Sequence, residues 1–334
     1  MRDVAIDLLH VGRFTPVAPY QRFAYLCSGL LIASAAFHAA VFLVDGGPWV
    51  GPISWRKPIV FGLSFGITLA TLTWITTFLR PRKAVGWAVL GTYSLASVGE
   101  VALISMQRWR GVPSHFNEST AFDGLVFSMM GSLVTLIGIL TVLITVRSFF
   151  RVDAPRPLAR AIRLGLVLML VSQAVGVQMI AEGGNTFGAA GALKVPHAVA
   201  LHAAQVLPAL ALVLLASRAS ERHVLRVLAV GTTGYVGLVA SVMAQTYSGR
   251  AALDLAVVPA ALALLGFGLL VGSGAVAMFN LAASRSPTSP NTFGGPSGAA
   301  PLGRAYEKSA DLVVARPAAR DEWRGAVLPD CCQG

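Results

Sequence analysis

Eight apolar segments divide this chain, and each is long enough to cross the hydrocarbon core of a bilayer as a helix. They cover 24–45, 58–79, 84–106, 121–146, 161–181, 197–217, 224–246 and 255–280. Only 12% of the 334 residues are charged, whereas soluble domains average about 25%. The pattern therefore predicts an all-α, polytopic membrane bundle of eight transmembrane helices and excludes a water-soluble enzyme.

The basic residues predict the orientation of these helices. A nucleic-acid partner would require cations clustered on one soluble face, but here they stand between the apolar segments. Fifteen lie near the membrane on the side of the N-terminus, from Arg2 to Arg285, and six on the other side. Because cytoplasmic loops carry the excess of Lys and Arg, we expect a multi-pass protein of the cell (plasma) membrane with both termini in the cytoplasm.

Two halves of the chain share landmarks in the same order. Asp45-Gly46-Gly47-x-x-x-Gly51 returns as Glu182-Gly183-Gly184-x-x-x-Gly188, and Gln107-x-Trp109-x-Gly111 returns as Gln245-x-Tyr247-x-Gly249. Repeated landmarks indicate a duplication. Each copy holds four spans, an even number, so the copies enter the membrane in the same direction. The sequence thus predicts two parallel four-helix repeats, as in several transporters.

The repeats define the expected domain limits. The first repeat occupies 24–146 and the second 161–280, joined by a cytoplasmic linker over 147–160. An amphipathic cytoplasmic segment, 1–23, precedes them. Residues 284–334 are rich in Ser, Pro and Gly and then in mixed charge, which predicts a disordered cytoplasmic tail.

Polar residues of the outer loops and outer span ends form the candidate binding site. Arginine forks bind carboxylates and phosphates, and a carboxyl group inside a span needs a cation or a proton. We therefore expect an outward-facing cavity between the repeats that binds or transports a small anionic solute, with Glu100 as a proton-coupling group. Its predicted lining is Arg56, Lys57, Glu100, Arg108, Arg110, His115, Asn117, Glu182, Lys194, His197 and His202. The competing interpretation of the cations is snorkelling and pairing with acids such as Asp123.

A second function class rests on histidines. His38, His115, His197 and His202 all fall in the outer half, which suits a membrane-embedded redox enzyme using a metal, haem or quinone. However, His197 and His202 are five residues apart, and this spacing does not place two ligands on one helix face. Three cysteines without a regular spacing predict neither a disulfide framework nor a zinc site. The pattern assigns no cofactor and no oligomeric state.

Glycine pairs indicate where helices approach closely. Gly62-x-x-x-Gly66 and Gly268-x-x-x-Gly272 each place two small residues on one helix face. Such pairs allow the backbones of neighbouring membrane helices to touch. We expect both pairs to contact a neighbouring helix.

Three outer motifs also carry a family resemblance. They are Trp55-Arg56-Lys57-Pro58, Arg110-Gly111-x-x-Ser114-His115-Phe116-Asn117-x-x-Thr120 and Val195-Pro196-His197-x-x-x-Leu201-His202. The chain resembles a group of uncharacterised bacterial multi-span integral membrane proteins that share these motifs over the eight spans. The resemblance implies a bacterial plasma-membrane setting and no particular activity.

Overall fold

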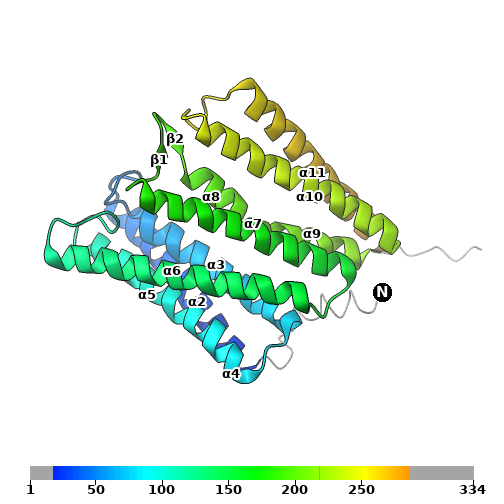
Figure 1. The fold of residues 1–334 in the computed structure, drawn as a ribbon, viewed down its shortest axis with the longest axis horizontal. Helices are drawn as coiled ribbons and strands as arrows, with labels where there is room; N and C mark the ends of the chain where they lie inside the picture. Colours follow the sequence, from blue (N-terminus) through cyan, green and yellow to red (C-terminus); the bar gives the residue numbers. More distant parts are fainter. Residues whose placement is uncertain (1–17, 218, 286–334) are drawn as a thin grey trace, which may run out of the picture. The chain divides into compact units, whose positions relative to one another are not determined.

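A computed structural model of the chain describes residues 18–217 and 219–285 (Figure 1). Within these residues, eight helices are long and apolar enough to cross a membrane, which confirms the predicted all-α membrane class. Of the predicted amphipathic segment, 1–23, residues 1–17 lie outside the described residues. The predicted disordered tail lies outside them from residue 286 onward.

The eight spans follow one another with short connections. In chain order they are α2 (Pro19–Asp45), α3 (Arg56–Leu79), a composite third span, α6 (Ala121–Phe150), α7 (Arg156–Ala181), a composite sixth span, α10 (Glu221–Tyr247) and α11 (Val257–Arg285). The third span joins α4 (Lys83–Gly86), the π-helix η1 (Trp87–Gly91) and α5 (Thr92–Trp109). The sixth joins α8 (Lys194–Leu201) and α9 (Ala203–Ala216).

The helices extend beyond the apolar segments that predicted them. Helix α2 begins at Pro19 rather than at residue 24, and α11 continues to Arg285. The predicted linker 147–160 is helical at both ends, so only 151–155 connect α6 to α7. Hydropathy marks the part of a helix that lies in hydrocarbon. Charged and aromatic residues at the ends stay helical because their long side chains reach the interface.

The sixth span is interrupted at a predicted site residue. Helix α8 ends at Leu201, His202 adopts a turn-like backbone, and α9 begins at Ala203. Pro208 follows inside α9, where it cannot donate a backbone hydrogen bond. The break directs the two segments differently and places His202 at the joint.

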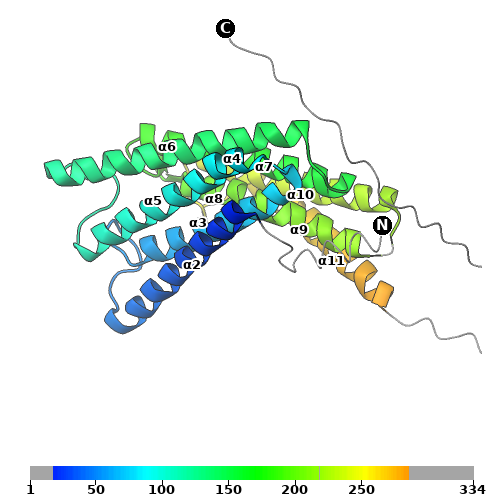
Figure 2. The same cartoon turned by 90° about the horizontal axis from the view of Figure 1, so that it is seen from below.

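Helix packing follows the same order in each half. Helix α2 packs on α3 and α5, α3 on α5, and α5 on α6; likewise α7 packs on α8 and α9, α9 on α10, and α10 on α11. The halves meet where α6 lies beside α7 and α3 touches α9 (Figures 1 and 2). One buried apolar cluster crosses this boundary and includes Leu69 and Leu72 of α3 and Leu158 and Ile162 of α7.

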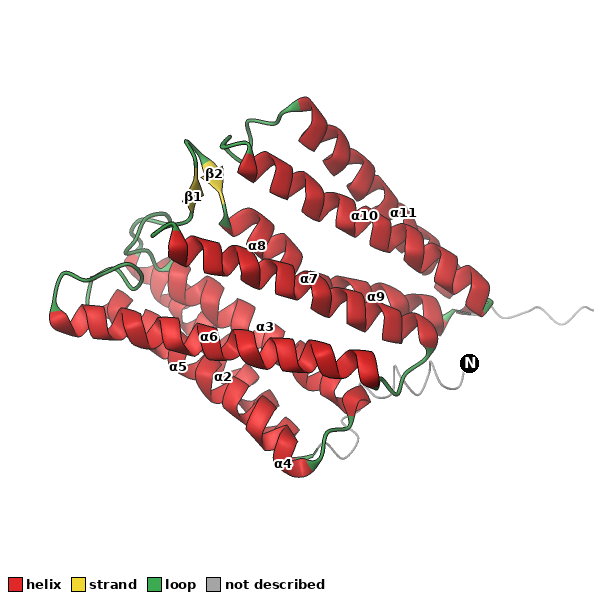
Figure 3. Cartoon of the chain, viewed as in Figure 1, coloured by secondary structure: helices red, strands yellow, loops and turns green. Residues whose placement is uncertain are grey.

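The connections that hold the candidate site share one end of the bundle. The loops between α2 and α3, between α5 and α6, and between α7 and α8 lie at the end opposite the first described residues (Figure 3). In the last of these loops, β1 (Thr186–Phe187) and β2 (Gly191–Ala192) form an antiparallel hairpin with Thr186 opposite Ala192. After the orientation expected from the basic residues, we call this end of the bundle the outer end.

The two glycine pairs differ in their surroundings. A Cβ atom on Gly62 would lie 2.9 Å from the backbone oxygen of Leu31, and one on Gly66 would lie 2.6 Å from an Ile32 side-chain carbon. The first pair therefore lets α3 approach α2, as predicted. Gly268 and Gly272 have nothing within 4 Å of such an atom, so the prediction was wrong for the second pair. Spacing alone predicts a small-residue face but not whether another helix covers it.

Replacing Gly62 by Ala is expected to destabilise the protein, because the methyl group must push α2 and α3 apart. Overpacking of this kind costs about 1–3 kcal/mol. Gly272→Ala is the matched control. Its methyl group meets open space, so the change should be neutral or slightly stabilising, since Ala is favoured over Gly in a helix by about 1 kcal/mol. Thermal unfolding of both variants in detergent measures the difference, and equal midpoints would contradict the helix contact.

Candidate functional site

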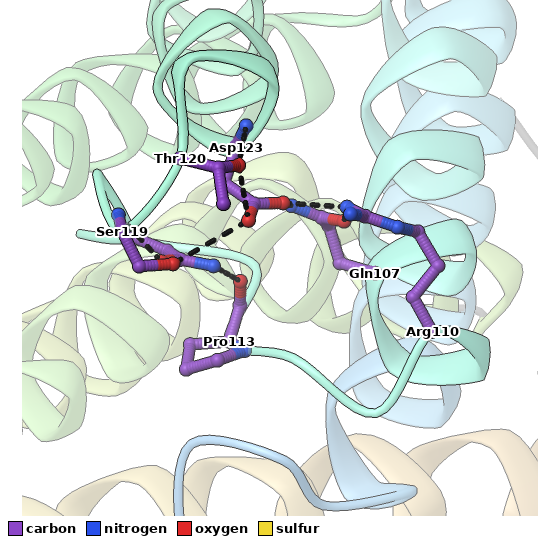
Figure 4. Close-up of polar contacts among 7 residues, drawn as sticks. Gln107, Arg110, Pro113, Ser119, Thr120 and Asp123 are labelled. Atoms are coloured by element: carbon purple, nitrogen blue, oxygen red, sulfur yellow. Dashed lines mark hydrogen bonds and ion pairs between the residues drawn. The ribbon is translucent and has the colours of Figure 1, made fainter.

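Arg110 is held by a polar network at the outer end of α5. Its guanidinium pairs with Asp123 at the start of α6, with 2.5 Å between Nη1 and Oδ1, and also donates to the side-chain oxygen of Gln107 (Figure 4). Gln107 donates to the same carboxylate at 3.0 Å, and the hydroxyl of Thr120 donates at 2.8 Å. Asp123 is only 2% exposed. The charge of Arg110 is thus already neutralised, as the pairing interpretation expected.

Asn117 has a similar role within the loop between α5 and α6. Its amide nitrogen donates to the Pro113 carbonyl at 3.0 Å, and its oxygen accepts from the backbone and hydroxyl of Ser119. Because both ends of the amide are occupied, Asn117 shapes the loop. Phe116, next to it, has a backbone φ of 57°, a value that residues other than glycine rarely adopt.

Glu100 lies beneath this loop in an unusual environment. The residue is fully buried, and neither carboxyl oxygen has a hydrogen-bond partner among the described residues. His115 faces it, with 3.9 Å between Oε1 and Nε2, and the two form an ion pair only when the imidazole is protonated. A buried carboxyl group without a donor is expensive, and in membrane proteins such groups commonly mark proton or substrate pathways.

His115 is linked in turn to Lys57. The Ser114 hydroxyl lies 2.9 Å from His115 Nδ1 and accepts from Lys57 Nζ at 3.4 Å. The lysine ammonium can only donate, so the Ser114 oxygen accepts from Lys57. The Ser114 hydroxyl proton then needs an acceptor of its own, and Nδ1 of His115 is the acceptor within reach. His115 then carries its own proton on Nε2, which faces Glu100. The structure brings together Lys57, His115 and Glu100 from three different segments.

Arg108 and Arg56 lie near an aromatic cluster. The Arg108 guanidinium carbon is 3.7 Å from the centre of the Trp55 ring, which stacks edge-to-face on Trp109. The Nε atoms of Arg56 and Arg108 are both buried, and neither has an acceptor among the described residues. Each is therefore an unsatisfied charged donor, a group that normally requires a partner.

His38 belongs to the same aromatic cluster, but its two nitrogens are already used. Nδ1 lies 2.7 Å from the Ser34 carbonyl oxygen, which can only accept, so this nitrogen carries the proton. Nε2 accepts a hydrogen bond of 3.1 Å from Trp109 Nε1. This arrangement leaves neither nitrogen available to coordinate a metal or haem iron.

The predicted residues of the second half do not join this group. Glu182 and Lys194 are exposed, His202 lies at the joint of α8 and α9, and His197 is bound to α7. His197 Nδ1 lies 2.8 Å from the Ser172 carbonyl, while the Ser172 hydroxyl donates to the His197 carbonyl. Within residues 18–217 and 219–285, no hydrogen bond, ion pair or ring contact links these four side chains to those of the first half.

Metal binding was tested on the same side chains. In the part of the chain that the structure describes, no group of three or more His, Cys, Asp or Glu side chains is close enough to hold a metal ion. The four histidines of the redox hypothesis therefore do not converge. Two cavities of the described bundle, one that includes Tyr25 and Trp74 and one that includes Tyr20 and Arg80, have none of the eleven predicted site residues in their lining.

Sequence reasoning missed the groups that connect the predicted residues. Ser114 bridges Lys57 and His115, and the ring of Trp55 lies against the Arg108 guanidinium. Both residues belong to motifs whose charged, imidazole and amide side chains were predicted to bind. The sequence feature that could have identified them is their position next to those predicted residues.

Comparison of the chain with protein-family models, with curated proteins and with solved structures gives no match.

The pKa of His115 predicts a pH dependence of stability. Burial, and then the positive charge of Lys57, lower this pKa from 6.5 to about 4. Between these values only the unfolded chain binds the proton, so the free energy of unfolding falls as pH drops from about 6.5 towards about 4. The expected loss is about 2–3 kcal/mol.

Unfolding in detergent between pH 4 and 7 measures this effect. In His115→Gln, the stability lost across the window should be smaller by that amount. His223→Gln, which removes an exposed histidine of α10, is the control and should retain the dependence of the natural chain. An unchanged slope in His115→Gln would show that other groups cause the acid sensitivity.

Proposed function

We propose that this integral membrane protein binds a small anionic solute at its outer end and carries it across the membrane. The observation that carries the proposal is the pair of buried guanidinium nitrogens, Arg56 Nε and Arg108 Nε, without acceptors. An anion supplies such acceptors, and an arginine fork binds carboxylate or phosphate oxygens in a well-defined geometry. Arg110 stays outside this direct contact because Asp123 already neutralises it.

Glu100 provides the coupling group in this proposal. A buried carboxyl group needs a cation or a proton, and among the described residues Glu100 has no hydrogen-bond donor and no charged partner other than His115. His115 is placed to pass a proton to it from the outer surface, because a quarter of its side chain is exposed while its Nε2 faces the carboxyl group. Uptake of a proton from the outside by this pair would add one positive charge at the same end of the bundle as the two arginines, and this couples anion binding to proton uptake.

We further propose that the bundle is a pair of parallel repeats. Gly111 and Gly249 have φ of 71° and 72°, and Gly46 and Gly183 have φ of 66° and 61°. Gln107 donates to Asp123 in the first turn of the fourth helix of its half, and Gln245 donates to Asp254 just before the fourth helix of its own half. Two halves of the same design can move against each other about a central site, as alternating access requires.

The proposed setting is a bacterial plasma membrane with both termini in the cytoplasm. The resemblance of the outer motifs and the distribution of basic residues support it. The outer-end loop 110–120 then faces the outside, where a solute first meets the protein.

Impermeant maleimide labelling tests the orientation. In a chain with Cys331→Ser and Cys332→Ser, a cysteine at the exposed Glu118 should be labelled in intact cells. A cysteine at the exposed Arg156, which begins α7, should be labelled only after the membrane is opened. Cys27 is buried and should contribute little background. The reverse pattern would place the candidate site in the cytoplasm.

Anion binding is tested by ligand-induced thermal stabilisation of the purified protein with phosphate, sulfate, acetate and citrate. At least one should raise the midpoint, because a ligand that binds the folded state stabilises it. Arg108→Gln should abolish the rise, since removing a desolvated charge partner costs about 2–5 kcal/mol. Glu100→Gln should keep binding but lose its dependence on pH.

Arg250→Gln is the matched control, because Arg250 forms an exposed ion pair with Asp254 at the outer end of the second half. It should keep the stabilisation. If Arg108→Gln and Arg250→Gln lost the ligand-induced stabilisation equally, the anions would be acting on the overall positive charge and not at the proposed site. A stoichiometric metal or a haem absorption band that disappears in His202→Ala would instead favour the redox enzyme.

A further inference from the structure

A cavity of about 560 Å³ lies at the end of the bundle opposite the candidate anion site. It is bordered by the ends of α2, α3 and α6 and by the start of the third span, and four arginines line it: Arg80, Arg82, Arg147 and Arg151. Among the described residues, no Asp or Glu contributes to its lining. Its volume falls in the range of small-molecule sites, about 300–1,000 Å³.

The positive charge of this cavity is only partly compensated. Arg80 pairs with Asp153 at 2.9 Å, and Arg147 makes one long contact of 3.4 Å to the Leu79 carbonyl. Arg82 and Arg151 are exposed, and their side chains make no hydrogen bond or ion pair with any described residue. Three of the four cations therefore lack an anionic partner.

The hydroxyl group of Tyr20 adds a second, independent feature. Tyr20 lines the cavity and is only 5% exposed, yet its hydroxyl makes no hydrogen bond within residues 18–217 and 219–285. Its ring fits tightly against α4, because a Cβ atom on Gly86 would lie 2.5 Å from it. The hydroxyl borders the cavity with its donor unused, so it can donate to an oxygen of a bound head group.

The remaining wall of the cavity is apolar. Val85 and Leu143 are exposed on neighbouring spans, and Val89 belongs to η1. The cations stand at the ends of the spans, whereas Leu143 and Val89 lie further along them towards the hydrocarbon. A phosphate ion would gain nothing from this wall. A lipid would place its head group at the cations and an acyl chain along the apolar residues.

We propose that this cavity binds an anionic phospholipid. Arg82, Arg147 and Arg151 contact the phosphate group together with the Tyr20 hydroxyl, and one acyl chain lies along Val85, Val89 and Leu143. Basic pockets between membrane helices on the cytoplasmic side are known to hold such head groups. The lipid site is separate from the anion site at the outer end and does not depend on it.

Native mass spectrometry of the full chain in detergent tests the proposal. The probes are palmitoyl-oleoyl phosphatidylglycerol and phosphatidylcholine with the same chains, so that only the head-group charge differs. Phosphatidylglycerol should bind in a one-to-one complex and phosphatidylcholine should not. The triple variant Arg82→Gln, Arg147→Gln, Arg151→Gln should bind it roughly a hundredfold more weakly.

The matched control removes the same charge at the same end of the bundle but outside the cavity: Arg160→Gln, Arg222→Gln, Arg226→Gln. It should retain the one-to-one complex. Equal loss in both triple variants would overturn the site in favour of general surface charge. If the first variant does not fold, Arg82→Gln alone and Tyr20→Phe alone should each weaken binding several-fold.

Two further measurements separate a lipid from a free phosphate. Glycerol phosphate at the same concentration should not displace phosphatidylglycerol, and Val89→Trp should weaken lipid binding although every cation remains. Displacement by glycerol phosphate, or full binding by Val89→Trp, would show a phosphate site without a chain groove and overturn the lipid proposal.

Discussion

The absence of water in hydrocarbon governs this structure. Backbone groups there must find partners within the chain, and helices meet that requirement in full. Side chains obey the same rule less strictly, because a polar side chain can reach the interface or a neighbouring helix. Thr141 and Ser148 donate to carbonyls of their own helix, and Gln173 donates across to Thr141. Against this background, the unpartnered groups at Glu100, Arg56 and Arg108 stand out.

The two halves use their outer ends differently. In the first half, the α5–α6 loop folds over Glu100, and its own residues Ser114 and His115 are buried and half-buried. In the second, a short hairpin leads into α8, and His197 is occupied by the Ser172 carbonyl. The two halves therefore differ in the loops at this end. Loops can change without disturbing a bundle, since few buried contacts depend on them.

Much of the fold could be predicted from the sequence, because the length and hydropathy of a segment indicate whether its helix is surrounded by lipid or by water. The helix ends were less readable: Pro19 and Arg285 are helical but lie outside the apolar segments. The candidate site was predicted in part. Lys57, Glu100 and His115 do meet, but Arg110 is neutralised by Asp123 and His38 is saturated by Ser34 and Trp109. Residue type indicates what a side chain can bind, whereas only its neighbours decide whether it is already bound.

The π-helical turn at Trp87–Gly91 has a consequence for the chemistry at the other end of the same span. A π-helical turn corresponds to one residue inserted into an α-helix. Every residue after it is rotated by about 100° and advanced by about 1.5 Å relative to an uninterrupted helix. Glu100, Gln107 and Arg108 all follow this turn. A single inserted residue near the opposite membrane face thus sets the direction in which Glu100 and Arg108 point from the third span. Deleting one residue in that turn would rotate both side chains, although the deletion lies far from the outer end.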